Sequence, residues 1–122
     1  MKYSLFIGRW QPLHDGHLWL INQRLKEGKN VCLAIRDVEP NDNQPWTAKE
    51  IEKMVHEGPL KDLIADKKVI TTIIPDIESV NYGRGVGYEV IEHVPPEEIG
   101  DISATKIREQ MRKDGKLYYL GF

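Results

Sequence analysis

Two histidines near the N-terminus, His14 and His17, stand three residues apart in the segment Gly-Arg-Trp-Gln-Pro-Leu-His-Asp-Gly-His (residues 8–17). The segment follows a short apolar run and precedes apolar residues at helical spacing, so it is expected to open a helix. A helix N-terminus offers unpaired N–H groups and the positive end of the helix dipole. Gly16 lets an anion approach the backbone closely, and the Arg9 guanidinium suits phosphate oxygens. These features predict a polyphosphate site in which the histidines donate hydrogen bonds to a transferring phosphoryl group.

The histidine pair also fits a structural role or a metal site. In the structural role, one of His14 and His17 caps the helix while the other is simply exposed on the surface. In the metal site, the two rings bind zinc, although no third ligand is evident nearby in the sequence. Arg9, Gly16 and the position between a strand and a helix favour the phosphate site over both.

A second group of candidate residues lies near the C-terminus, at residues 101–108. Ser103 is a good N-cap for a last helix that is expected to end near Gly115. Lys106 and Arg108 then lie close to the start of this helix, where cations oppose the helix dipole. An anion bound there would resolve the mismatch, and a solvated helix face with ordinary basic residues explains it equally well.

Strands and helices are expected to alternate along the chain and to bring the two segments together. The expected strands are short apolar runs, at residues 4–7, 31–35, 69–74 and 88–94. The expected helices show amphipathic spacing or capping signals, at residues 15–27, 47–58, 60–65 and 103–115. This alternation predicts an α/β fold, a Rossmann-like parallel sheet with helices on both faces in a single compact domain. Ligands then bind beyond the carboxyl ends of the strands, where residues 8–17, 36–37 and 75–76 should converge.

Composition limits the possible classes of protein. The 122 residues carry 17 Lys and Arg against 19 Asp and Glu, a net charge of −2 that argues against a nucleic-acid coat. No apolar run approaches the roughly 18 residues that a membrane span needs, so no membrane partner is expected. The single cysteine, Cys32, excludes an internal disulfide framework and favours a cytoplasmic location, and it is expected to be buried and inert.

The two segments together resemble the His-x-Gly-His nucleotidyltransferase superfamily, which includes cytidylyltransferases and nicotinamide-mononucleotide adenylyltransferases. Residues 14–17 match its His-x-Gly-His motif, and residues 102–108 are similar to its Ile-Ser-x-Thr-x-Ile-Arg signature. Residues 8–12 look most like the Gly-Arg-Phe-Gln-Pro sequence of archaeal-type adenylyltransferases, and residues 44–47 resemble their Asn-Pro-Phe-Thr segment. Residues 100–107 are instead close to the cytidylyltransferase form. The resemblance implies one cytidylyltransferase-like nucleotidyltransferase domain over residues 1–122.

For the reaction, the resemblance implies transfer of a nucleoside monophosphate from a nucleoside triphosphate to a small phosphorylated acceptor, with release of pyrophosphate. AMP from ATP is slightly favoured over CMP from CTP. By the same resemblance His14 and His17 are catalytic, and Mg²⁺ accompanies the nucleotide, with protein ligands that the sequence does not identify. The residues expected to bind the nucleotide are Gly8, Arg9, Trp10, Gly16, Ser103, Thr105, Lys106 and Arg108.

The chain also departs from the adenylyltransferase pattern. Glu50-Ile51 stands where those enzymes carry a Glu-Arg pair, and the stretch between the third strand and the last helix is much shorter. That stretch helps to form the acceptor pocket, so the acceptor is not carried over from the resemblance. A non-catalytic nucleotide-binding or regulatory module of the same fold is the alternative, against which the intact histidine pair argues. A homo-oligomer is a further expectation.

Several residues near the expected crevice have two interpretations each. Arg36 and Asp37 at the end of the second strand contact nucleotide or acceptor, or they form a surface ion pair. The glycine-rich residues 81–87 form a phosphate loop or, more in keeping with such sequences, a mobile connection. Trp10 stacks on a base or belongs to the core.

Overall fold

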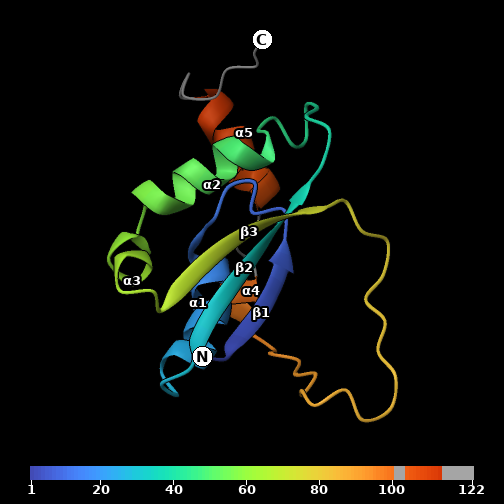
Figure 1. Ribbon diagram of the computed structural model, residues 1–122. Coiled ribbons are helices and arrows are strands. Elements are labelled where there is room, and N and C mark those ends of the chain that lie inside the picture. The colour runs from blue at the N-terminus through green and yellow to red at the C-terminus, as the bar shows by residue number, and fades with distance from the viewer. Residues whose placement is uncertain (101–103, 114–122) are drawn as a thin grey trace.

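The structure is a computed structural model and describes residues 1–100 and 104–113. Within these residues three parallel strands form one sheet, β1 (Tyr3–Gly8), β2 (Asn30–Asp37) and β3 (Val69–Pro75). The strand order is β1-β2-β3, so β2 lies in the centre (Figure 1). Each strand coincides with one of the apolar runs of the sequence, which confirms the first three predicted strands.

Helices connect the strands and follow them. Helix α1 (Asp15–Leu25) joins β1 to β2, while α2 (Ala48–Glu57) and the short α3 (Lys61–Ala65) join β2 to β3. These confirm the three helices expected in this part of the chain. The short α4 (Glu97–Gly100) was not predicted, and α5 (Ala104–Lys113) lies within the predicted range 103–115. None of the described helices is long and apolar enough to cross a membrane.

Helix α2 begins where its capping sequence predicts. The hydroxyl of Thr47 accepts a hydrogen bond from the backbone N–H of Glu50 at 3.1 Å. In return the carboxylate of Glu50 accepts from the backbone N–H of Thr47 at 2.9 Å. This reciprocal capping box satisfies two backbone donors that the first turn of a helix leaves without partners. It therefore fixes where the loop after β2 turns into α2.

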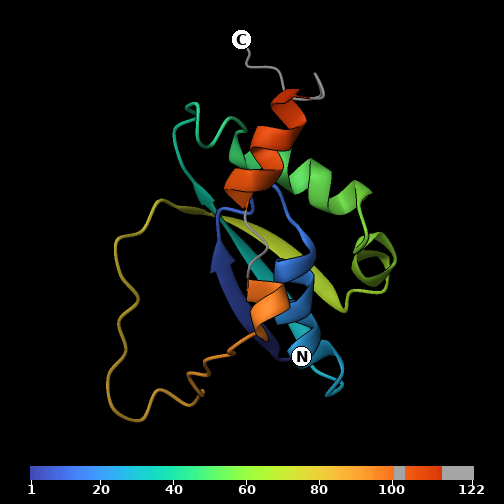
Figure 2. The ribbon, with the colours of Figure 1, turned by 180° about the vertical axis from the view of Figure 1, so that it is seen from behind.

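The hydrophobic core lies between the sheet and helices α1 and α2. Val31, Leu33 and Ile35 alternate along β2 and are fully buried, and they meet Ile21 of α1 and Ile51 of α2. Since alternate residues of a strand point to opposite faces, this core lies on one face of the sheet. Figure 2 shows α1 and α4 in front of the strands from that side, with α5 beyond the carboxyl ends of the strands. The Rossmann-like α/β class predicted from the sequence is confirmed.

The second face of the sheet differs from the prediction of helices on both faces. Figure 1 views this face, and none of the described helices covers it. Leu5 of β1 is 59% exposed there, beside Cys32 and Ile70 in the register of the strands. Cys32 is half-buried rather than buried, and burial raises the pKa of its thiol. A helix on this face would have to follow β3, and residues 76–96 contain no helix.

The fourth strand predicted at residues 88–94 is wrong. Residues 76–96 run as a loop that swings away from the sheet, drawn in yellow and orange in Figure 1. Tyr88, Val90 and Val94 are exposed, while His93 stacks on Phe6 with ring centroids 6.1 Å apart. Apolar alternation indicates a strand only if a neighbouring strand supplies hydrogen bonds. In the described structure this segment has no such neighbour.

Candidate active site

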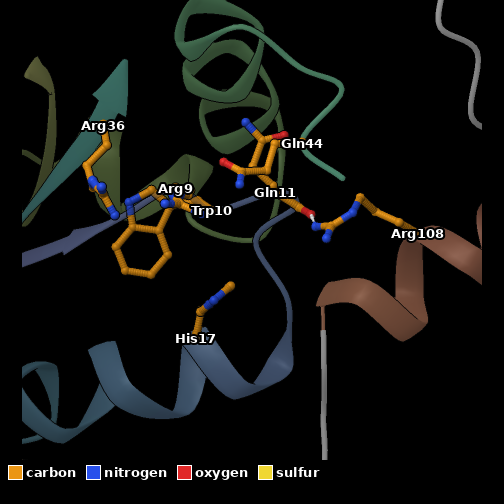
Figure 3. Close-up of a pocket in the computed structure, with 7 residues that line it drawn as sticks. All are labelled: Arg9, Trp10, Gln11, His17, Arg36, Gln44 and Arg108. Carbon is orange, nitrogen blue, oxygen red and sulfur yellow. Dashed lines mark hydrogen bonds between the residues drawn. The ribbon is translucent and has the colours of Figure 1, made fainter. Parts of the chain in front are cut away.

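A pocket of about 520 Å³ lies at the carboxyl ends of β1 and β2, where the parallel sheet was predicted to place it. Arg9 directly follows β1, and Arg36 is the second-last residue of β2. Figure 3 shows the residues that line the pocket. They come from five parts of the chain, namely the loop after β1, α1, β2, the loop before α2, and α5, and are Arg9, Trp10, Gln11, His17, Arg36, Gln44 and Arg108.

His14 and His17 hold each other at the N-terminus of α1. His14 is the N-cap, and its Nδ1 accepts from the backbone N–H of Gly16 at 3.0 Å. The Nδ1 of His17 accepts from the backbone N–H of His14 at 3.2 Å, and the rings stack with centroids 3.7 Å apart. A Cβ on Gly16 would lie 2.9 Å from Cε1 of His14, so only glycine leaves room for this cap. His17 lines the pocket, and His14, which stacks on its ring, is not among the lining residues.

The hydrogen bonds also determine where the two rings carry their protons. A neutral imidazole that accepts at Nδ1 carries its proton on Nε2 and donates from there. Burial and the neighbouring His14 lower the pKa of His17 to about 4. Burial also lowers the pKa of His14, although Asp15 opposes the shift. Both rings are therefore neutral at pH 7, and each has an Nε2–H donor that is not used by its cap.

Trp10 forms a wall of the pocket rather than an open stacking platform. It is 5% exposed, and its Nε1–H donates to the carbonyl of Ala34 at 3.1 Å. Its ring meets His17 edge-on, with centroids 4.8 Å apart. A Cβ on Gly8 would lie 2.9 Å from Cε2 of Trp10, so glycine is needed where the two pack together. Trp10 has a φ of 53°, a left-handed conformation that costs energy in a bulky residue and is typical of functional sites.

Gln11 is a pocket residue for which the sequence predicted no role. It is 3% exposed, its amide nitrogen donates to the carbonyl of Trp46 at 2.9 Å, and its amide oxygen accepts from the N–H of Trp46 at 3.2 Å. The loop after β1 is thereby attached to the N-terminus of α2. The partners are 35 residues apart, so no local pattern could have revealed the contact. Gln44, which also lines the pocket, belongs to residues 44–47, whose resemblance to the Asn-Pro-Phe-Thr segment predicts no separate role for it.

The structure brings Arg108 of the second sequence segment to the first segment. Arg108 of α5 is 6% exposed, lines the pocket and donates from Nη1 to the backbone carbonyl of Gln11. Lys106 is exposed and is not among the lining residues. Thr105 lies in α5, where its side chain is not described, and Ser103 lies outside the described residues. The predicted contribution of these three residues to nucleotide binding stays a prediction.

The lining of the pocket is cationic. Three guanidinium groups, those of Arg9, Arg36 and Arg108, line it together with His17, and no Asp or Glu is among the described lining residues. With cations and no carboxylate on its walls, the pocket favours a ligand with several negative charges. In residues 1–100 and 104–113 no group of three His, Cys, Asp or Glu side chains could hold a metal ion, so the zinc interpretation has no support there.

The chain is similar to curated nicotinamide-nucleotide adenylyltransferases. It is 35% identical over 81 residues to those of Caldivirga maquilingensis and Pyrobaculum neutrophilum, which is 65% of this chain and 46% of each relative. An alignment of 137 residues with the Thermococcus onnurineus enzyme gives 28% identity over 90% of this chain and 72% of the relative. The chain thus spans about half the length of the first two relatives. No family model and no solved structure matches it.

The chain is a Rossmann-like α/β domain with a cationic pocket at the carboxyl ends of its strands. The comparisons then support the nucleotidyltransferase superfamily for this chain, with similarity to its archaeal nicotinamide-nucleotide adenylyltransferases. The resemblance predicted from the two sequence motifs is confirmed at this level.

Proposed function

We propose that this chain is an adenylyltransferase that moves AMP from ATP to a mononucleotide acceptor and releases pyrophosphate. The names of the relatives support AMP over CMP, and they do not favour a non-catalytic module. The observation that carries the proposal is the neutral, mutually capped pair His14 and His17 beside a pocket lined by three arginines. Such a pair supplies fixed hydrogen-bond donors where phosphate charge is handled.

In the proposed reaction an oxygen of the acceptor phosphate attacks the α-phosphorus of ATP. The new bond joins acceptor and AMP, and the bond between the α-phosphorus and the bridging oxygen breaks to release pyrophosphate. The acceptor phosphate is already ionised at neutral pH, so no residue has to remove a proton from it. Neutral histidines fit this chemistry, because His17 acts as an Nε2–H donor to the charge that develops in the transition state.

The remaining predicted residues support the same reaction. Arg9 and Arg108 neutralise and orient the triphosphate, since each has planar donors suited to phosphate oxygens. Gly8 and Gly16 make room for Trp10 and for the cap of His14, respectively. Ser103, Thr105 and Lys106 are proposed as further triphosphate ligands on the basis of the sequence resemblance alone.

Mg²⁺ is proposed as a companion of the triphosphate. The described residues do not build a site for it, because no carboxylate lines the pocket and no metal-binding cluster is present among them. Mg²⁺ binds few protein ligands when phosphates coordinate it, so it is expected to arrive bound to ATP. A homo-oligomeric state and a cytoplasmic location also stay predictions.

The proposal is tested with the purified chain, Mg²⁺, nicotinamide mononucleotide and each of the four ribonucleoside triphosphates in turn. Pyrophosphate release should be fastest with ATP and should depend on the mononucleotide. Thermal unfolding in the presence of each triphosphate provides a second measurement, because a specific ligand stabilises the folded state by mass action. Stabilisation by ATP without any pyrophosphate release would instead indicate a nucleotide-binding module.

A further inference from the structure

Arg36 is held by two acceptors, and one of its guanidinium donors has no partner among the described residues. Its Nη2 donates to the Asp76 carboxylate at 2.5 Å and to the backbone carbonyl of Ile77 at 2.9 Å. Its Nε is buried and has no hydrogen-bond partner among the described residues. Arg36 lines the same pocket as His17 (Figure 3).

A buried hydrogen-bond donor without a partner destabilises the folded state, and the destabilisation is larger when the donor belongs to a charged group. The guanidinium is planar and rigid, so the two acceptors that hold Nη2 also fix the orientation of the Nε–H group. Asp76 and Ile77, which directly follow β3, therefore hold the Arg36 guanidinium in a fixed orientation before any ligand binds. A ligand with an anionic oxygen against the guanidinium in the pocket offsets this destabilisation, because charge-assisted hydrogen bonds are the strong ones.

The position of Arg36 indicates which ligand this is. Figure 3 shows Arg36 and Arg108 at opposite sides of the pocket, with Trp10 and Gln11 between them. Arg108 contacts the loop that leads to α1, the part of the site proposed to hold the triphosphate. The side near Arg36, at the end of β2, is then left for the second substrate.

We propose that Arg36 binds an anionic oxygen of the acceptor nucleotide and so determines which acceptor is used. This inference rests on the proposed function. Two sources of this oxygen share the same chemistry: the phosphate of the acceptor and a carboxylate on its base. Asp76 acts as a positioning residue, because it contacts Arg36 and is not among the residues that line the pocket. Arg36 would therefore discriminate between acceptors and leave the recognition of ATP to other residues.

The test compares wild type with Arg36→Gln. Steady-state kinetics with ATP give KM for nicotinamide mononucleotide and nicotinic acid mononucleotide, and calorimetry gives the affinities of both and of nicotinamide riboside. The variant should raise KM for an acceptor by about ten- to a hundredfold, which is the usual effect of losing a hydrogen bond to a charged group. Its KM for ATP should stay within about twofold of the wild-type value. Weaker binding of both mononucleotides but not of the riboside identifies the phosphate. A loss confined to nicotinic acid mononucleotide identifies the carboxylate.

Three further variants separate binding from structure. Arg24→Gln is the matched control, because Arg24 also pairs with a carboxylate, that of Glu27 at 3.0 Å, but lies outside the pocket. It should leave both KM values unchanged. Asp76→Asn keeps an acceptor for Nη2 and should raise the acceptor KM less than Arg36→Gln does. Arg36→Lys keeps the charge but lacks Nε–H, and it provides the same test if Arg36→Gln does not fold.

The inference is overturned if Arg36→Gln, or Arg36→Lys in its place, changes KM for ATP and for the acceptor equally, or changes neither. It is also overturned if Arg24→Gln produces the same loss. If wild-type protein releases no pyrophosphate from ATP with either mononucleotide, the proposed function itself is wrong. The wild-type reaction shows this before any variant is made, so the two failures are distinguishable.

Discussion

In His14 and His17 a structural cap coincides with the chemical role proposed for the same side chains. Each Nδ1 accepts a backbone N–H of the first turn of α1, which is what a capping box does with oxygen atoms. The cap therefore fixes the tautomer and the direction of both rings. Of the interpretations drawn from the sequence, the capping role is correct for His14, and it strengthens the interpretation of His17 as a donor, because a capped ring is a preorganised one.

The pH dependence of stability follows from the pKa of His17. That pKa is about 4 in the folded chain and about 6.5 when the ring is free in solution. Between these values the unfolded state binds a proton that the folded state does not, so the free energy of unfolding decreases as the pH falls from about 6.5 to about 4. Above about 6.5 the contribution is complete, and below about 4 no more is lost.

Thermal unfolding across this pH range measures the effect in wild type and in His17→Asn. Asn has an acceptor oxygen for the His14 N–H but no titrating ring. The variant should therefore lose less stability than wild type as the pH falls. Parallel pH profiles for the two proteins would show that His17 does not titrate with a lowered pKa.

Among the elements, the loop after β1 forms the joint between α1, α2 and α5. Gln11 pairs with both backbone groups of Trp46 before α2, and its own backbone carbonyl accepts from Arg108 of α5. Arg112 of α5 also donates to the backbone carbonyl of Asp42 in the loop before α2. Positions of the pocket residues thus depend on how these three helices meet.

Gln11→Ala should lower the free energy of unfolding by about 2 kcal/mol, because it leaves the N–H and C=O of Trp46 without the partners they have in the folded state. Chemical denaturation measures the loss. Gln23→Ala is the matched control, since the Gln23 amide bonds only the carbonyl of Trp19 one turn earlier in α1. Gln23→Ala should lower the free energy of unfolding by less than about 0.5 kcal/mol. Equal losses in the two variants would show that Gln11 does not hold the loop after β1 to α2.

The elements also show what could be predicted from the sequence. Apolar runs and capping sequences predicted β1 to β3 and α1 to α3 because these signals act over a few residues. Residues 88–94 carry a strand pattern but have no neighbouring strand in the described structure, so the pattern was misleading. The partners of Gln11 and Arg36 lie 35 and 40 residues away in the chain, and such tertiary contacts leave no local signal.

At the scale of the whole molecule, the sheet is packed on one side. Leu33 is fully buried on the face that meets α1 and α2, whereas Leu5 is largely exposed on the opposite face. The chain spans about half the length of the first relatives to which it is similar, and the described part holds the histidine pair, the arginines and the helices that join them. The cationic pocket is thus formed by a sheet that, in the described part of the chain, has helices on one face.

One-sided packing predicts unequal costs for the same substitution on the two faces. Leu33→Ala should destabilise by about 3 kcal/mol, since it leaves a cavity in the core. Leu5→Ala should cost less than about 1 kcal/mol, because its side chain is already in contact with water. Denaturant unfolding of the two variants measures both values. Similar costs would show that the second face is buried in solution as well.

In the proposed reaction, His17 stabilises the transfer of AMP. The most direct measurement follows the label of α-phosphorus-labelled ATP with nicotinamide mononucleotide and Mg²⁺, in wild type and in His17→Asn. We expect wild type to place one label in the dinucleotide for each pyrophosphate released, and the variant to do so roughly a hundred- to a thousandfold more slowly while it still binds ATP. Label that stays on the nucleotide as ADP or free AMP, or a variant as fast as wild type, would contradict the claim.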